Sequence, residues 1–418
     1  MKYEDYVDLN YKPSKHDLIC EFYLEGKGFH DLKRTAGGIA AESSIGTWTE
    51  IGTIKPYMMN FAATVFSLKK VSKNSAHIKI AYPNDLFEPG NLPNIMSSIA
   101  GNIFGMKDVR WLRLNDIIFP KNIVQSFKGP KYGIEGIRKI FKLKKPRPLI
   151  GTIIKPKLGL NTKDHAQVAY QAWLGGCDIV KDDENLTSQK FNKFEERLQE
   201  TFKMKEKAER ETGEKKVYMI NITAETKEML RRAKLVQDYG NEYVMVDIIT
   251  TGWAALQTLR NENFNLVLHA HRAGHAALDK DVKHGISMKV LSRLIRMIGL
   301  DQLHIGTAVG KMFETHGEVL ENKKVLTEEF YGLKPVMPVA SGGLQPLMIP
   351  ELYKIFGRDV ILQFGGGIHG HPLGTLAGAK AVRQALDATL QEKSLENYAK
   401  VKGLIELKTA IKHFSKDH

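Results

Sequence analysis

The apolar positions of the chain change their pattern near residue 130. Before that point, extended patterns predict strands over 18–26, 77–83 and 109–120, while a helical pattern covers 93–105. Strands and helices are mixed here without a regular order. We therefore expect an N-terminal α+β domain over 1–130.

The rest of the chain, 131–418, alternates short apolar runs with helical patterns. Eight β-rich segments can be distinguished: 148–156, 177–184, 217–223, 243–250, 265–272, 302–308, 335–343 and 360–367. Near-continuous apolar strands separated by helices indicate parallel pairing with both faces buried. Eight such units favour a (β/α)8 TIM barrel followed by C-terminal helices, with an open doubly wound α/β sheet as the alternative.

Polar or glycine residues end seven of these eight segments, and the fourth offers only Asp247. A single polar residue after a strand usually belongs to a turn or a cap. The same pattern at seven of eight strand ends is not explained by turns alone. In a barrel, catalytic groups gather at the carboxyl ends of the strands. The residues in question are Lys155, Lys157, Lys181 to Glu184, Asn221, Thr223, His269 to Arg272, His304, Ser341 to Gly343 and Gly365 to Gly367.

One lysine and three acids, Lys181 to Glu184, end the second segment. Lys181 and Asp183 share a strand face, and Glu184 follows where the backbone can turn. Two carboxylates are a poor site for Mg²⁺, which prefers octahedral oxygen coordination, and an ammonium group is no ligand. Reaction of Lys181 with CO2 would give a carbamate and so a third anionic ligand. The simpler alternative is a lysine that neutralises an acidic strand end.

The fifth segment carries His269 and His271 on one strand face. In metal-dependent hydrolase barrels such a pair can bind zinc, which is a competing interpretation. Arg272 follows directly, and a guanidinium beside a metal pair is unfavourable but well suited to phosphate. His269 by itself is expected to be a packed core residue.

Glycine runs end the last two segments, Ser341-Gly342-Gly343 and Gly365-Gly366-Gly367. Glycine lets backbone N–H groups approach an anion closely, as in the phosphate sites of TIM barrels. GGGIHG also fits a dinucleotide fingerprint, but no strand with an acid follows, so we reject that interpretation. Lys311, in a glycine-flanked loop after the sixth segment, suits a mobile lid.

The net charge of +14 would attract polyanions. The lysines are scattered through amphipathic helical patterns such as 200–216 and 392–412, so a small anionic substrate is favoured and no nucleic acid partner is expected. No apolar run is long enough to span a membrane, and MKYEDYVDLN is not a signal peptide. Cys20 and Cys177 cannot form a disulfide framework, so a cytoplasmic location is expected.

Eight stretches together are similar to one family along almost the whole chain: AESSIGTWT, AGNIFGMK, GTIIKPKLGL, GGCDIVKDDENLTSQKF, HAHRAGHAA, HIGTAVGK, PVASGG and QFGGGIHGHPLG. The sequence resembles the large subunit of ribulose-1,5-bisphosphate carboxylase/oxygenase (RuBisCO), in its archaeal-type form III branch. The resemblance implies Mg²⁺-dependent carboxylation and oxygenation of ribulose-1,5-bisphosphate through an enediolate, with carboxylation giving two 3-phosphoglycerates.

The same resemblance assigns the metal and proton chemistry. It implies that CO2 carbamylates Lys181, and that the carbamate binds Mg²⁺ together with Asp183 and Glu184 and serves as the base for enolisation. Lys155 would handle protons at the enediol and its products, assisted by Lys157.

It also assigns the substrate contacts. Lys311 on the lid would stabilise the new carboxylate, and His271 would move protons during hydration. Arg272, His304 and Ser341 would hold one phosphate and nearby hydroxyls. The second phosphate would be held by glycines, from the set Gly342, Gly343, Gly365 and Gly366.

Four N-terminal residues, Glu42, Thr47, Trp48 and Asn102, would complete the site of the neighbouring subunit, which implies an antiparallel homodimer or an assembly of dimers. Form III resemblance favours a role in AMP or nucleotide salvage. Two alternatives remain: a RuBisCO-like enolase or isomerase of a sugar or thiosugar phosphate, and a non-catalytic phosphate- or RNA-binding barrel.

Three departures from the family pattern stand out. After Lys311 the usual Met/Leu-Glu-Gly is replaced by the longer, more apolar run 312–317. Gly274 replaces a methionine beside Arg272, and the segment 318–333 is short. The family's CO2/O2 discrimination and rate of lid closure therefore do not carry over to this chain from the resemblance.

Overall fold

The computed structural model describes residues 2–49, 51–143, 145–309 and 314–415. The chain forms two compact units. One comprises Met1–Lys128, Gly274–Ile298 and Phe330–Leu333; the other comprises Gly129–Ala273, Gly299–Glu329 and Lys334–His418. Among the described residues, no helix is long and apolar enough to cross a membrane.

The N-terminal unit is built on a sheet with the strand order β10-β4-β1-β3-β2 among the described residues. Alternate residues of β1 are buried, as expected of a strand with one face on a core. The strands expected near 18–26, 77–83 and 109–120 are confirmed, whereas β2 was not anticipated. The bounds are β1 (Leu18–Gly26), β2 (Thr64–Lys70), β3 (Ser75–Tyr82), β4 (Val109–Ile118) and β10 (Gly285–Ile286).

The helical pattern at 93–105 corresponds to α2 and a following 3-10 turn, Asn102–Gly105. Helix α1 begins after Asp31, whose side chain accepts a hydrogen bond from the Arg34 amide and so caps the helix. The helices of this unit are α1 (Leu32–Glu42), α2 (Leu92–Ile99), α3 (Lys121–Gln125), α10 (Ala276–Asp279) and α11 (Met288–Ile298).

In the second unit, eight parallel strands of the described residues close into a barrel, in the order β11-β12-β13-β5-β6-β7-β8-β9. The predicted TIM barrel is confirmed, and the open sheet is excluded. Each strand lies within one of the eight predicted segments: β5 (Leu149–Ile153), β6 (Ile179–Lys181), β7 (Val217–Asn221), β8 (Tyr243–Asp247), β9 (Val267–His271), β11 (Gln302–His304), β12 (Met337–Ser341) and β13 (Ile361–Phe364).

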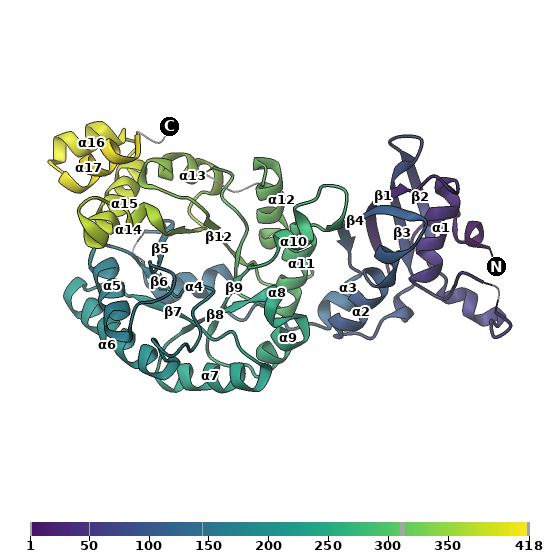
Figure 1. The fold of residues 1–418 in the computed structure, drawn as a ribbon, viewed down its shortest axis with the longest axis horizontal. Coiled ribbons are helices and arrows are strands. Elements are labelled where there is room, and N and C mark those ends of the chain that lie inside the picture. Colours follow the sequence, from purple (N-terminus) through teal and green to yellow (C-terminus); the bar gives the residue numbers. More distant parts are fainter. Residues whose placement is uncertain (1, 50, 144, 310–313, 416–418) are drawn as a thin grey trace. The chain divides into compact units, whose positions relative to one another are not determined.

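Helices surround these strands, as α5, α6 and α7 show in Figure 1. The strand residues are almost all buried, because side chains facing the barrel axis and those facing the helices both lie in apolar layers. The helices are α4 (Gly133–Phe141), α5 (Thr162–Leu174), α6 (Phe194–Thr212), α7 (Thr226–Asp238), α8 (Ile248–Thr251), α9 (Trp253–Asn261), α12 (His316–Thr327), α13 (Ile349–Phe356), α14 (Gly366–His369), α15 (Gly374–Leu390), α16 (Leu395–Lys402) and α17 (Ile405–Phe414).

The two long helical patterns differ from the structure at their ends. The pattern at 200–216 belongs to α6, which stops before Gly213. A single helix over 392–412 is wrong, because α16 ends at Lys402, just before Gly403, and α17 then begins at Ile405. Both glycines adopt left-handed backbone conformations, which terminate helices readily at glycine.

Candidate active site

Lys181 is the last residue of β6, and its side chain is fully buried. Its Nζ donates to the backbone oxygen of Asp182 at 2.8 Å and lies 2.9 Å from the Sδ of Met245. Burial lowers the pKa of the Lys181 amine, although Glu184 and Asp183 act to raise it. A buried amine whose ammonium form is disfavoured is a suitable nucleophile for a small electrophile.

The two acids beyond Lys181 lie close to basic side chains. The Nζ of Lys155 lies 2.6 Å from the Oδ2 of Asp183. Glu184 lies 3.6 Å from the Nζ of Lys157 and 3.7 Å from the Nε2 of His271. Burial raises the pKa of Glu184, but His271 and Lys181 outweigh it and lower that pKa to about 2. Both strand-end lysines predicted for the site therefore reach the acid cluster.

The donor set fits a divalent cation only if Lys181 is modified. Among the described residues, no group of three or more His, Cys, Asp or Glu side chains could hold a metal ion. Conversion of the Lys181 ammonium to a carbamate would add a third anionic oxygen ligand beside Asp183 and Glu184. It would also change the local charge by two units, which is the charge of Mg²⁺.

Asp182, the remaining charged residue of the cluster, has a structural role. Its carboxylate is buried and binds the Nε2 of His165 at 3.1 Å, the Nε of Arg197 at 3.1 Å and the Tyr218 hydroxyl at 2.8 Å. The backbone N–H of Asn221 donates a fourth hydrogen bond to this carboxylate, at 3.0 Å. These bonds tie the end of β6 to α5, α6 and β7, so Asp182 anchors the strand that presents Lys181.

The histidines of β9 do not pair with each other. The Nδ1 of His271 lies 2.8 Å from the Oδ1 of Asp247. His269 instead places its Nδ1 2.8 Å from the Oε1 of Gln302 and its Nε2 2.8 Å from the Nε2 of His304. Because both ring nitrogens of His269 are occupied within the protein, the zinc-pair interpretation has no support in this geometry. Asp247, the weak signal of the fourth strand, orients His271.

The side chains expected to bind phosphate already have partners in the chain. The NH2 atom of Arg272 lies 2.5 Å from the Oε1 of Glu314, and the side chains are only 5% and 3% exposed. Gly306 lies beside this pair with a φ of +93°, a backbone conformation that residues with a side chain rarely adopt, so glycine is favoured there. His304 binds the Oγ of Ser341 through Nδ1 at 2.6 Å.

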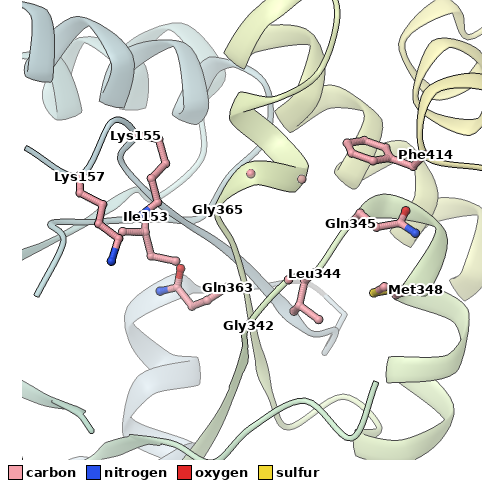
Figure 2. A pocket seen from close by; sticks show the side chains of 13 residues that line it. Ile153, Lys155, Lys157, Gly342, Leu344, Gln345, Met348, Gln363, Gly365 and Phe414 are labelled. Atoms are coloured by element: carbon pink, nitrogen blue, oxygen red, sulfur yellow. The ribbon is translucent and has the colours of Figure 1, made fainter. Parts of the chain in front are cut away.

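A pocket of about 710 Å³ opens beside Lys155 and Lys157 (Figure 2). Glycine is required at Gly367, since a Cβ there would lie 2.1 Å from the backbone oxygen of Leu344. The expected phosphate glycines and the two lysines thus share one pocket. Its lining residues are Ile153, Lys155, Lys157, Gly342, Gly343, Leu344, Gln345, Met348, Gln363, Gly365, Gly366, Gly367 and Phe414.

Gln363 is a lining residue that the sequence analysis did not single out. Its side chain is buried, and both amide atoms have no hydrogen-bond partner among the described residues. The signal was available: Gln363 is the polar residue of an otherwise apolar strand, two positions after the core residue Ile361. Side chains at i and i+2 share a face, so it points toward the barrel interior.

The remaining predicted residues lie elsewhere. Glu42, Thr47, Trp48 and Asn102 belong to the N-terminal unit. The Glu42 carboxylate accepts a hydrogen bond from the Tyr3 hydroxyl at 2.7 Å, whereas the Trp48 side chain is 82% exposed. Lys311, together with Met312 and Phe313 of the unusual lid tip, lies outside the described residues.

Two family models match nearly the whole chain. The model of the ribulose bisphosphate carboxylase large chain, N-terminal domain, matches residues 5–123. The model of the ribulose bisphosphate carboxylase large chain, catalytic domain, matches residues 133–414.

Relatives and solved structures agree with these models. The chain is 51% identical to ribulose bisphosphate carboxylase of Methanosarcina mazei, over 97% of this chain and 98% of the relative. It is 47% identical to that of Methanocaldococcus jannaschii, over 98% and 100%. The octameric RuBisCO of Pyrococcus horikoshii, in complex with sulfate ion, superposes with a TM-score of 0.95 at 45% identity, covering 100% of this chain and 98% of that one. The dimeric archaeal RuBisCO of Hyperthermus butylicus gives 0.91 at 42%, covering 98% and 99%.

Proposed function

The chain belongs to the ribulose bisphosphate carboxylase large-chain family, and from this premise we propose that it carboxylates and oxygenates ribulose-1,5-bisphosphate. Carboxylation would give two molecules of 3-phosphoglycerate. The observation that carries the proposal is the buried Lys181 amine, which feels the charges of Asp183 and Glu184. These two acids in turn pair with Lys155 and Lys157 of the glycine-lined pocket. The role in AMP or nucleotide salvage rests on the form III resemblance.

Activation begins at Lys181. The lone pair of the neutral Nζ adds to the carbon of CO2, and one proton leaves the nitrogen, which gives the carbamate. The carbamate, Asp183 and Glu184 would hold Mg²⁺. When bound, the ion supplies polarisation of the substrate carbonyl, which makes the neighbouring C–H more acidic. The pairs Lys155–Asp183 and Lys157–Glu184 keep these acids satisfied before activation.

Lys155 and His271 are placed to move protons. Lys155 lines the pocket and reaches the acid cluster, so its ammonium can donate to the enediol and its products. His271 is held by Asp247 through Nδ1, which leaves Nε2 directed toward Glu184 and the reacting centre. A proton can therefore be exchanged at Nε2 while Nδ1 stays fixed.

The two phosphates would anchor the substrate at the ends of different barrel strands. The glycine ends of β12 and β13 offer backbone N–H groups to one phosphate. Arg272, at the end of β9, offers a guanidinium to the other. Fixing both ends orients the carbonyl over the acid cluster and lowers the entropic cost of the reaction.

The active unit is proposed to be a homodimer in which Glu42, Thr47, Trp48 and Asn102 complete the neighbouring barrel. The exposed Trp48 side chain supports this, because a large exposed aromatic group is typical of an interface. The solved relatives are described as dimeric and octameric, which is compatible with a dimer or an assembly of dimers.

The proposed function is tested by product analysis. The purified protein is incubated with bicarbonate and Mg²⁺, ribulose-1,5-bisphosphate and isotopically labelled bicarbonate are added, and label in 3-phosphoglycerate is measured. We expect label in 3-phosphoglycerate. Isomerised or enolised sugar phosphate without label would instead support the enolase alternative, and salt-sensitive RNA binding without turnover would support the non-catalytic one.

A further inference from the structure

A continuous chain of hydrogen bonds crosses three neighbouring barrel strands behind the site. Gln302 and His304 lie on β11, His269 on β9 and Ser341 on β12. The links are Gln302 Oε1 to His269 Nδ1 at 2.8 Å, His269 Nε2 to His304 Nε2 at 2.8 Å, and His304 Nδ1 to Ser341 Oγ at 2.6 Å. Gln302, His269 and His304 are buried, and only Ser341 is partly exposed.

The number of hydrogens, together with the orientation of the Gln302 amide, fixes the direction of every link. Each neutral imidazole carries one N–H, so the two rings supply two hydrogens for three links. With the oxygen of Gln302 as acceptor, His269 carries its hydrogen on Nδ1 and accepts at Nε2. His304 must then carry its hydrogen on Nε2 and accept at Nδ1. The third hydrogen is that of the Ser341 hydroxyl.

The geometry itself orients the Gln302 amide. The Oε1 atom of Gln302 lies 2.8 Å from the Nδ1 of His269, so the amide oxygen faces the ring and accepts its hydrogen. Reversal of the amide would reverse all three links and turn Ser341 from a donor into an acceptor within the chain.

We propose that His269 and Gln302 are positioning residues that hold His304 as its Nε2–H tautomer and thereby make the Ser341 oxygen an acceptor for a hydroxyl group of the bound sugar phosphate. The inference rests on the proposed function and deepens it. His304, whose ring nitrogens are both engaged, acts on the ligand through Ser341. The direction of the relay discriminates a hydroxyl donor from an acceptor oxygen at this position.

The kinetic test compares two substitutions of His269. His269→Phe keeps a flat ring but removes both nitrogens, while His269→Gln keeps a polar group where Nε2 lies. We expect His269→Phe to raise the KM for ribulose-1,5-bisphosphate about tenfold, the size of one lost hydrogen bond, with kcat within about threefold of wild type. His269→Gln restores the KM to within about twofold of wild type. His371→Gln is the matched control, because this buried histidine binds the backbone oxygen of Glu406 outside the pocket.

A second readout does not depend on turnover. In ¹⁵N-histidine-labelled full-length protein, long-range proton–nitrogen spectra report which ring nitrogen of His304 carries hydrogen. We expect the Nε2–H tautomer in wild type and a mixture of tautomers in Gln302→Met, which keeps the side-chain length but has no amide.

These results separate the inference from the proposed function. An Nδ1–H tautomer of His304 in wild type, or an unchanged KM in His269→Phe, would overturn the relay even in an active carboxylase. Conversely, a wild-type protein without carboxylation but with the Nε2–H tautomer refutes the proposed function and leaves the tautomer assignment standing.

Discussion

The Nζ of Lys155 lies 2.6 Å from the Oδ2 of Asp183, so a proposed catalytic lysine and a proposed metal ligand form an ion pair. Asp183 is buried, while Lys155 reaches it from the pocket. The carboxylate has a partner before any metal binds, and metal binding must compete with that ammonium group. This pair therefore links activation to the availability of the catalytic lysine.

The first prediction separates the two roles of this pair. Lys155→Met removes the proton donor and also the competitor for Asp183. We expect kcat to fall at least about 100-fold, as for loss of a general acid or base. Trapping of activating CO2 should persist and require no more Mg²⁺ than in wild type. Measurement of both quantities on one preparation checks this; a Lys155→Met protein that no longer traps CO2 would show that the lysine is needed for activation itself.

The Arg272–Glu314 pair gives a second prediction. A phosphate that binds Arg272 must share or displace the Glu314 carboxylate, which lies 2.5 Å away. Glu314→Gln should therefore tighten binding of inorganic phosphate by roughly tenfold, the scale of a hydrogen bond to a charged group. Without phosphate the variant should melt at a lower temperature, because a buried guanidinium loses its counter-charge.

Isothermal titration with inorganic phosphate and melting curves with and without it provide the measurement. Glu318→Gln is the control, since Glu318 bonds Thr315 at the start of α12 and is exposed. It should leave phosphate affinity unchanged. Equal phosphate affinities of Glu314→Gln and wild type would refute competition for Arg272.

The third prediction concerns stability. Asp178, buried next to β6, accepts two bonds from Arg147 at 2.7 Å each and one from Arg383 at 3.1 Å. Burial raises the pKa of the Asp178 carboxyl, but Arg383 and Arg147 outweigh it and hold that pKa well below its usual value. Asp178→Asn should cost about 3–5 kcal/mol, because two guanidinium groups lose a buried partner.

The interaction of Asp178 with Arg147 and Arg383 also predicts that stability depends on pH. A carboxyl whose pKa is lower in the folded than in the unfolded state stabilises the fold above its unfolded value, near about 3.9, and loses this as pH falls further. In urea unfolding, the free energy of unfolding of wild type should thus decrease as the pH falls below about 4. The decrease should be smaller in Asp178→Asn, which lacks this carboxyl. Glu200→Gln, which removes the exposed partner of Lys203, should change stability little. If Asp178→Asn lost as little unfolding free energy as Glu200→Gln, the stabilising role of Asp178 would be contradicted.

The fourth prediction tests the shared site. If each site combines one barrel with the N-terminal residues of the neighbour, Trp48→Ala and Lys181→Met should complement each other on co-expression. Random pairing gives about half mixed dimers with one intact site in two, so activity should reach about a quarter of wild type. Lys155→Met with Lys181→Met should give none, because both changes fall in the barrel. Equal failure of the two combinations would argue for sites contained within one subunit.

Much of the barrel was predictable because its strands are short, apolar on both faces and separated by helices. The end of β6 was harder to interpret. The alternation of a strand put Lys181 and Asp183 on one face, but it could not show that Asp182 binds His165 and Arg197 on the other. Those partners come from helices that follow and precede the strand by many residues, so only the tertiary structure unites them.

Other features depended on long-range packing or on weak local signals. The break at Gly403 lies within a continuous amphipathic pattern, and one glycine inside such a pattern is often tolerated. The burial of Glu314 against Arg272 joins residues on loops after different strands. Likewise, the partners of His269 lie on β11, so sequence spacing suggested a metal pair that the structure does not support.

The proposed activity depends most directly on the chemical state of the Lys181 nitrogen in the activated protein. Wild type and Lys181→Met are incubated with CO2 and Mg²⁺, carbamates are captured with an alkylating agent, and the peptide that contains residue 181 is identified by mass spectrometry. We predict a captured carbamate at Lys181 in proportion to carboxylase activity, and neither carbamate nor activity in the variant. Full activity of wild-type protein with an unmodified Lys181 would contradict the account.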